Sequence, residues 1–236
     1  MVIYRPKTPL EAVELRKKID NSVFLAGGTE NLRLGSSVGS DDSLIDINNL
    51  VEKGIQKEKG SIIRIGALTT LQELIDSPLV PECVKKACYF CSSFEKRNSA
   101  TVGGNIGSRR DDSFLLALFS VLGVTFHSFT PHGEEMKSVS EYATTKCRRL
   151  IDYFLLDTSK KTFVKRFGLT ATSHASVIAA SSSSYYALSV KGSSFAFGTS
   201  PSIYGEISYA DDITGSAEYK KYLASIVFTL KEAQLC

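Results

Sequence analysis

Two glycine pairs constrain this chain more than any other feature of its sequence. Gly27-Gly28 follows a short apolar stretch, 23–26, which predicts a buried strand that stops at the glycines. Gly103-Gly104 lies within 97–107, a segment whose apolar residues follow neither a helical nor a strand period. Each pair therefore predicts a loop. Glycine lets the backbone of such a loop adopt a positive φ, or lets another group come close to it.

Loops of this kind are suited to bind an anion. Successive backbone N–H groups can point into one concavity, and an anion such as a pyrophosphate can approach a backbone that carries no side chains. Thr29 adds a hydroxyl to the first loop, and Asn105 adds an amide to the second. Neither loop has the spacing of a dinucleotide-binding fingerprint or of a P-loop, so a nucleotide would have to lie between the two. The alternative interpretation is a pair of ordinary glycine turns.

The composition excludes several classes of protein. The 236 residues are 43% hydrophobic and 22% charged, and the net charge of +3 is too weak and too evenly spread to favour nucleic acid or an anionic membrane. No apolar run is long enough to predict a transmembrane helix, and 1–7 lacks the order of a signal peptide. Five cysteines, an odd number without a small secreted framework, predict mostly free thiols in a reducing cytoplasm.

The order of predicted elements is mixed α and β, followed by a small antiparallel sheet with one long helix. Thr70 and Glu73 have the spacing of a capping box at the start of a short helix. A domain boundary is expected near 158–161. Predicted helices cover 9–18, 70–75, 80–94, 111–122, 139–142 and 216–233; predicted strands cover 23–26, 43–47, 124–129, 150–156, 175–180, 185–190 and 202–209, with a hairpin over 55–65.

Three cysteines have a spacing that deserves a specific interpretation. Cys83, Cys88 and Cys91 match three ligands of a plant-type [2Fe–2S] cluster, with Cys147 as a candidate fourth. A cluster-binding loop needs irregular backbone, whereas these residues lie in a segment with helical periodicity and no glycine. We therefore interpret them as small buried hydrophobic residues.

A second motif suggests a hydrolase. Segment 35–39 fits a nucleophile elbow around Ser37, and Asp157 and His174 follow in the chain order of a triad. An elbow needs a strand before it and a helix after it, but 40–43 leads into a strand. A serine hydrolase that uses Ser37 is thus an alternative that the local context disfavours. No metal site is predicted, because the histidines lack the spacing of metal ligands.

Several segments, in their order along the chain, resemble one known family. They are Leu25-Ala-Gly-Gly-Thr-Glu30, Arg64-Ile-Gly-Ala-Leu-Thr-Thr-Leu-Gln-Glu-Leu74 and Arg97-Asn-Ser-Ala-Thr-Val-Gly-Gly-Asn105. This order is similar to that of the FAD-binding subunit of molybdenum hydroxylases, which includes the flavin domains of xanthine dehydrogenase and the medium subunit of aerobic carbon monoxide dehydrogenase. The tail, 211–222, resembles the end of the family's C-terminal domain, so the resemblance spans almost the whole chain.

The resemblance implies an α+β fold in two domains. Residues 1–160 would form a FAD-binding domain of the vanillyl-alcohol-oxidase (PCMH) type, with lobes of about 1–58 and 59–160. Residues 161–236 would form a small α+β C-terminal domain with an antiparallel sheet and a closing helix. FAD would lie extended between the lobes.

The resemblance also implies which residues hold FAD. Backbone of both glycine loops would bind the pyrophosphate, an acidic residue would bind ribose or ribityl hydroxyls, apolar residues would lie against the isoalloxazine ring, and a cation would lie near its N1–O2 edge. These residues are Leu25, Ala26, Gly27, Gly28, Thr29, Glu30, Thr101, Gly104, Asn105, Asp112, Leu150, Ile151, and Lys165 or Arg166.

The function implied is that of an electron-transfer flavoprotein subunit. FAD would receive electrons from partner iron–sulfur centres and pass them to NAD+ or another acceptor, beside a molybdopterin-binding large subunit and a [2Fe–2S] small subunit. No side chain of this chain needs to act as a general acid or base. Arg109 and Arg110 replace the small, proline-containing stretch of many relatives, and His174 stands near a common family aspartate. The two arginines motivate another alternative, a non-redox nucleotide-binding scaffold that has lost FAD.

Overall fold

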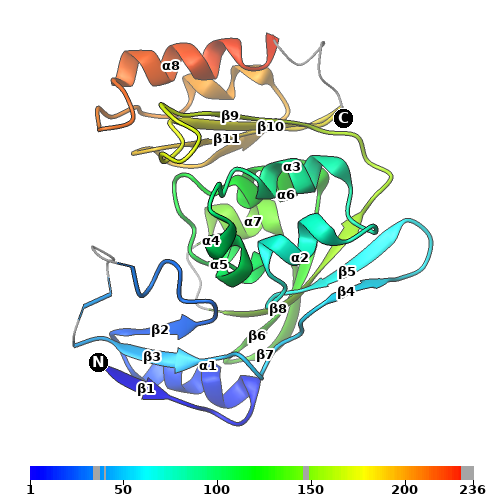
Figure 1. Ribbon diagram of the computed structural model, residues 1–236, viewed down its shortest axis with the longest axis vertical. Coiled ribbons are helices and arrows are strands. Elements are labelled where there is room, and N and C mark those ends of the chain that lie inside the picture. Colours follow the sequence, from blue (N-terminus) through cyan, green and yellow to red (C-terminus); the bar gives the residue numbers. More distant parts are fainter. Residues whose placement is uncertain (34–37, 40, 146–148, 230–236) are drawn as a thin grey trace.

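The computed structural model describes residues 1–33, 38–39, 41–145 and 149–229. Three sheets are arranged along the longest axis, and a group of short helices lies between the second sheet and the third (Figure 1). The first sheet is parallel, in the order β1-β3-β2, and consists of β1 (Val2–Tyr4), β2 (Ser22–Leu25) and β3 (Ser43–Asp46). Because β2 ends at Leu25, the first glycine pair lies at the carboxyl end of a parallel strand, where ligands commonly bind in such sheets.

Helix α1 (Pro9–Lys18) connects β1 to β2 and packs on the first sheet. Thr8 begins the helix, since its hydroxyl accepts a hydrogen bond from the backbone N–H of Glu11 (3.1 Å). Ala12 and Val13 are buried against Ile45 in a small separate core. The same core includes Leu68 and Leu150, so the first sheet and α1 pack against residues from later in the chain.

The second sheet is antiparallel, in the order β4-β5-β8-β6-β7. The pairing of β4 with β5 confirms the hairpin predicted over 55–65. It also places β4 in the second sheet. The strands are β4 (Ile55–Lys57), β5 (Ile62–Gly66), β6 (Thr125–Thr130), β7 (Gly133–Ser138) and β8 (Leu150–Asp157).

Helix α6 (Phe114–Leu122) is the centre of the largest core. All nine of its residues are buried, as expected for a helix that is apolar on every side. Ser113 caps its N-terminus, and Gly123, at φ 66°, ends it in the left-handed conformation. The helix packs against β10 and β11 of the third sheet. Around it lie α2 (Leu71–Asp76), α3 (Glu82–Cys88), α4 (Phe94–Ser99), α5 (Val102–Gly107) and α7 (Val139–Thr144) (Figure 1).

The predicted capping box is confirmed, but the next two helices along the chain were predicted with the wrong bounds. The Thr70 hydroxyl accepts from the N–H of Glu73, whose carboxylate accepts from the N–H of Thr70. The helix predicted over 80–94 ends at Cys88, because Ser93 turns the chain and caps a new helix, α4. The helix predicted from residue 111 starts only at Phe114, because Ser113 is its N-cap.

The third sheet is antiparallel, in the order β12-β11-β10-β9, and α8 (Ala217–Ile226) covers its face away from α6 (Figure 1). The strand predicted over 202–209 was wrong. Pro201–Gly205 instead form a 3-10 helix, because Ser200 caps it and proline suits a first helical position. The closing helix predicted over 216–233 ends at Ile226, and residues 230–233 lie outside the described ranges. The strands are β9 (Phe163–Phe167), β10 (Val177–Ser181), β11 (Tyr186–Val190) and β12 (Ala196–Gly198).

The cysteines on α3 belong to the core. Cys83 and Cys88 are buried among apolar side chains, and Cys147 lies outside the described residues. Within the described ranges, no three His, Cys, Asp or Glu side chains are placed to hold a metal ion. In the same part of the chain, no helix combines the length and the apolar character that crossing a membrane requires.

Candidate functional site

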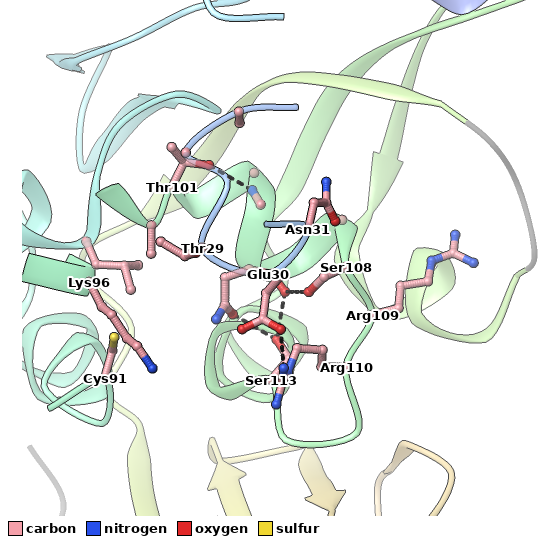
Figure 2. A pocket seen from close by; sticks show the side chains of 18 of the residues that line it. Thr29, Glu30, Asn31, Cys91, Lys96, Thr101, Ser108, Arg109, Arg110 and Ser113 are labelled. Atoms are coloured by element: carbon pink, nitrogen blue, oxygen red, sulfur yellow. Dashed lines mark hydrogen bonds and ion pairs between the residues drawn. The ribbon is translucent and has the colours of Figure 1, made fainter. Parts of the chain in front are cut away.

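One large cavity is lined by residues from all three sheets. Its volume is about 720 Å³, and its lining includes the first glycine loop, α5 and the connection from α5 to α6 (Figure 2). The start of β8 and the connection from β9 to β10 also line it. Most of the predicted cofactor-binding residues line it. They are Ala26, Gly27, Gly28, Thr29, Glu30, Thr101, Gly104, Asn105, Asp112, Leu150, Ile151 and Arg166.

The first glycine loop presents unused donors along the cavity wall. The backbone N–H groups of Gly27, Gly28, Thr29 and Glu30 donate to no acceptor in the part of the chain that is described. Gly28 has a φ of +70°, which glycine adopts without strain. A Cβ on Gly27 would lie 1.6 Å from the carbonyl oxygen of Ser99, so this loop presses directly against the α4–α5 connection. The loop therefore offers four successive N–H groups to an anion.

The second glycine segment differs from the prediction. It forms the short helix α5, and its N–H groups are already used by the protein: Val102 donates to Thr69 O (2.9 Å) and Gly103 to Ala67 O (2.9 Å). The N–H of Gly104 donates to the Thr101 hydroxyl (3.0 Å). The expected second concavity of backbone donors is thus absent from this described segment. The Thr101 hydroxyl keeps its own proton for a ligand.

Asn105 ties α5 to α6. Its Oδ1 accepts hydrogen bonds from the Ser113 hydroxyl (2.8 Å) and the N–H of Leu115 (3.3 Å). These bonds fix the side chain, so its acceptor is not available to a ligand. Its Nδ2 group donates to no acceptor among the residues described and is the part of the amide that a ligand can use.

Four charged or titratable side chains form a network at the cavity. Arg110 donates to both carboxylate oxygens of Asp112 (2.7 and 2.9 Å) and also to Glu30, and Figure 2 shows Arg110 beside Glu30. His174 Nδ1 lies 2.7 Å from Asp112 Oδ2. Burial acts to raise the pKa of Asp112, but hydrogen bonds from Arg110 and its charge outweigh burial and lower this pKa to about 2. Asp112 is thus ionised and already bound by protein.

Some of the predicted cofactor-binding residues line the cavity and others do not. Leu150 and Ile151, at the start of β8, are buried and line the cavity. Arg166 also lines it and donates to carbonyl oxygens of Thr170 (3.2 Å) and Ser173. Burial lowers the pKa of Arg166 from its ordinary value. Two predicted residues, Lys165 and Leu25, are not among the residues that line the cavity.

Several cations besides Arg166 line the cavity, and the sequence had singled out only the Arg109-Arg110 pair among them. Arg109 lines it with its guanidinium 3.8 Å above the ring centroid of Tyr142. The unusual Arg109-Arg110 pair was the only sequence signal for any of them. The other cavity-lining cations come from elements that only tertiary packing brings together, and they are Arg16, Arg33, Lys96 and Arg149.

The structure does not place the residues of the hydrolase alternative in a catalytic triad. Ser37 lies outside the described residues. Asp157 accepts hydrogen bonds from the hydroxyls of Ser61 and Ser159 (both 2.7 Å), whereas His174 is bound to Asp112. The predicted acid and base of the triad are therefore not bonded to one another.

Comparison with known proteins shows the family of the chain. A family model described as the FAD binding domain in molybdopterin dehydrogenase matches residues 1–167. The uncharacterized protein YgfM of Escherichia coli K12 is 29% identical over 166 residues, 69% of this chain and 61% of the relative. The xanthine dehydrogenase FAD-binding subunit of Escherichia coli O157:H7 is 30% identical over 148 residues, 60% of this chain and 50% of the relative. The chain thus spans about half to three-fifths of the length of these curated relatives.

Solved structures confirm the fold along the whole chain. Carbon monoxide dehydrogenase from Hydrogenophaga pseudoflava matches with a TM-score of 0.82 and 21% identity, over 99% of this chain and 96% of the matched chain. Quinoline 2-oxidoreductase from Pseudomonas putida 86 matches with a TM-score of 0.78 and 17% identity, over 96% and 93%. The predicted α+β fold is confirmed. With the family model matched over 167 of 236 residues, the chain belongs to the family of FAD-binding domains of molybdopterin dehydrogenases, whose cofactor is FAD.

Proposed function

We propose that this chain is the FAD-binding, electron-transfer subunit of a molybdenum hydroxylase that resembles xanthine dehydrogenase. The observation that carries the proposal is the run of four unused N–H groups, from Gly27 to Glu30, on the wall of a 720 Å³ cavity. Its partners would be a molybdopterin-binding large subunit and a [2Fe–2S] small subunit in the cytoplasm. Electrons would leave for NAD+ or another acceptor.

The residues of the cavity fit the chemistry of FAD. The N–H groups of the first loop would donate to the pyrophosphate oxygens, and the Thr101 hydroxyl would donate from the side of α5. Leu150 and Ile151 would provide an apolar wall for the isoalloxazine ring, and Arg166 would provide a cation for a negatively charged flavin. When bound, FAD supplies the ability to accept electrons singly and deliver them as a pair.

The protein's own task is to bind, to orient and to exclude water. The apolar residues of β8 exclude water from one end of the cavity, because Leu150 and Ile151 are each less than a tenth exposed. Asn105 and Ser113 fix α5 against α6 (2.8 Å), which holds Thr101 in place at the other wall. No described side chain is required to take a proton from a substrate.

Titration with FAD tests this proposal. The purified chain is expected to bind one FAD, with a flavin absorbance band that survives desalting and a higher melting temperature. FMN, which lacks the pyrophosphate bridge, should bind at least roughly tenfold more weakly, since it cannot use the same donors. A protein that stays colourless and whose melting temperature does not respond to FAD would contradict the proposal and favour the nucleotide-scaffold alternative.

A further inference from the structure

Arg110 binds both of the carboxylates that line the cavity near the first glycine loop. Its Nε and Nη2 donate to the two oxygens of Asp112, and its Nη1 donates to Glu30. The side chain of Arg110 is 19% exposed and that of Asp112 7%. Charge-assisted hydrogen bonds of this forked kind are among the strongest that side chains make. The guanidinium is therefore fixed between two carboxylates.

The two carboxylates are in a position that disfavours an anionic ligand. Glu30 belongs to the loop whose N–H groups are unused, and Glu30 and Asp112 line the same cavity. A pyrophosphate bound to this loop would lie near both negative charges, and partial burial strengthens their repulsion. Arg33 lies 3.1 Å from Glu30, but its side chain is 43% exposed. Solvent therefore screens its charge, and it offsets the negative charge of Glu30 only weakly. Arg110 is the more buried counter-ion and the one that Glu30 and Asp112 share.

The backbone before Arg110 has an uncommon conformation. Arg109 is the one non-glycine residue with a positive φ, 48°, in the described ranges. An L-residue pays a steric cost for this conformation, and such positions tend to occur where function requires a particular geometry. The turn after α5 lets Arg110 reach Glu30, eighty positions earlier in the chain.

The network also includes the C-terminal domain. His174, from the connection between β9 and β10, lies 2.7 Å from Asp112 Oδ2 and 3.1 Å from Arg110 Nη2. Since the shorter contact is the one to the carboxylate, we assign the Nδ1 proton to the bond with Asp112. Arg110 and Asp112 thus join three segments that enclose the cavity.

We propose that Arg110 is a positioning residue that neutralises Glu30 and Asp112 and so allows the Gly27–Glu30 loop to accept the pyrophosphate of FAD. The proposal rests on the proposed function. It assigns Arg110 an indirect role, through the two carboxylates, rather than a contact with the phosphates.

Substitution of Arg110 tests the proposal. In Arg110→Met the dissociation constant of FAD, measured by fluorescence titration, should rise roughly 10- to 100-fold. The defect should shrink as salt is added, because the uncompensated repulsion is screened. Arg110→Lys should bind FAD more tightly than Arg110→Met does. The double variant Arg110→Met with Glu30→Gln should recover more than half of the loss in the logarithm of FAD affinity. The melting temperature of each FAD-free variant is measured beside the affinity, because a purely structural role predicts that affinity falls and recovers only as the melting temperature does.

Arg64 offers a matched control. Its guanidinium also binds two carboxylates, Glu52 (2.9 Å) and Glu58 (2.8 Å), but it does not line the cavity. Arg64→Met should leave FAD affinity unchanged, whatever it does to the melting temperature. Wild-type affinity in Arg110→Met, or no gain from the added Glu30→Gln, would overturn the inference. Failure of the wild-type chain to bind FAD would instead overturn the proposed function.

Discussion

Replacement of Gly27 with alanine is expected to weaken FAD binding at least about 100-fold, or about 2.7 kcal/mol of binding free energy. The new Cβ would lie 1.6 Å from the carbonyl oxygen of Ser99, far inside any non-bonded contact. Because the neighbour is backbone, the first loop itself must shift and carry its N–H groups away from the cavity wall. The dissociation constant of FAD, from fluorescence titration, measures the effect.

A glycine without close neighbours provides the control for this substitution. A Cβ on Gly205 would meet nothing within 4 Å, and its φ lies outside the left-handed region. Gly205→Ala should therefore bind FAD as the wild type does. Gly27→Ala should also lower the free energy of unfolding of the FAD-free protein, by about 1–3 kcal/mol for overpacking. Unchanged FAD affinity in Gly27→Ala would show that the first loop is not the binding site.

Replacement of Lys220 with methionine is expected to cause the largest loss of stability. This lysine, on α8, has a fully buried side chain whose Nζ donates to Lys191 O and Ala210 O (both 2.9 Å) and pairs with Asp212 (2.8 Å). Methionine fills similar space but leaves two carbonyls without their donor and removes the cation that pairs with Asp212. The free energy of unfolding should fall by about 3 kcal/mol, the lower end for a broken buried pair, because Asp212 is partly exposed.

Urea denaturation measures this change, and a neighbouring residue is the control. Lys221 follows on the same helix and is exposed. Lys221→Met should change the unfolding free energy by no more than about 0.5 kcal/mol. Heating should show the same contrast, with a drop in melting temperature of roughly 6–12 °C for Lys220→Met alone. Equal stability of the two variants would contradict the role assigned to the buried ammonium group.

Structural features that depend on local sequence could be predicted from it. A glycine pair directly after an apolar strand identifies a loop at the end of a sheet strand, and Gly27-Gly28 lies there. The capping box at Thr70 depends only on two residues three positions apart. In both cases the residues that carry the sequence pattern also form the structural feature that it predicts.

Features set by distant contacts could not be predicted in the same way. The N–H groups of α5 are occupied because carbonyls of Ala67 and Thr69 reach them, and no local pattern shows this. Strand register separates Lys165 from Arg166, since Arg166 pairs with Ile178, a cavity residue. The bond between Arg110 and Glu30 joins residues eighty positions apart. Tertiary packing, rather than propensity, decides each of these.

The most direct test of the central claim is the response of individual backbone amides to FAD. In 1H–15N spectra, titration with FAD should shift the amide signals of Gly27, Gly28, Thr29 and Glu30 and saturate at one equivalent, since these groups gain an acceptor. Those of Val102 and Gly103 should move little, because their hydrogen bonds are internal. The assignment of the first loop as the pyrophosphate-binding element would be contradicted if no amide signal shifted. It would also be contradicted if the amide signals of α5 shifted strongly while those of Gly27–Glu30 did not.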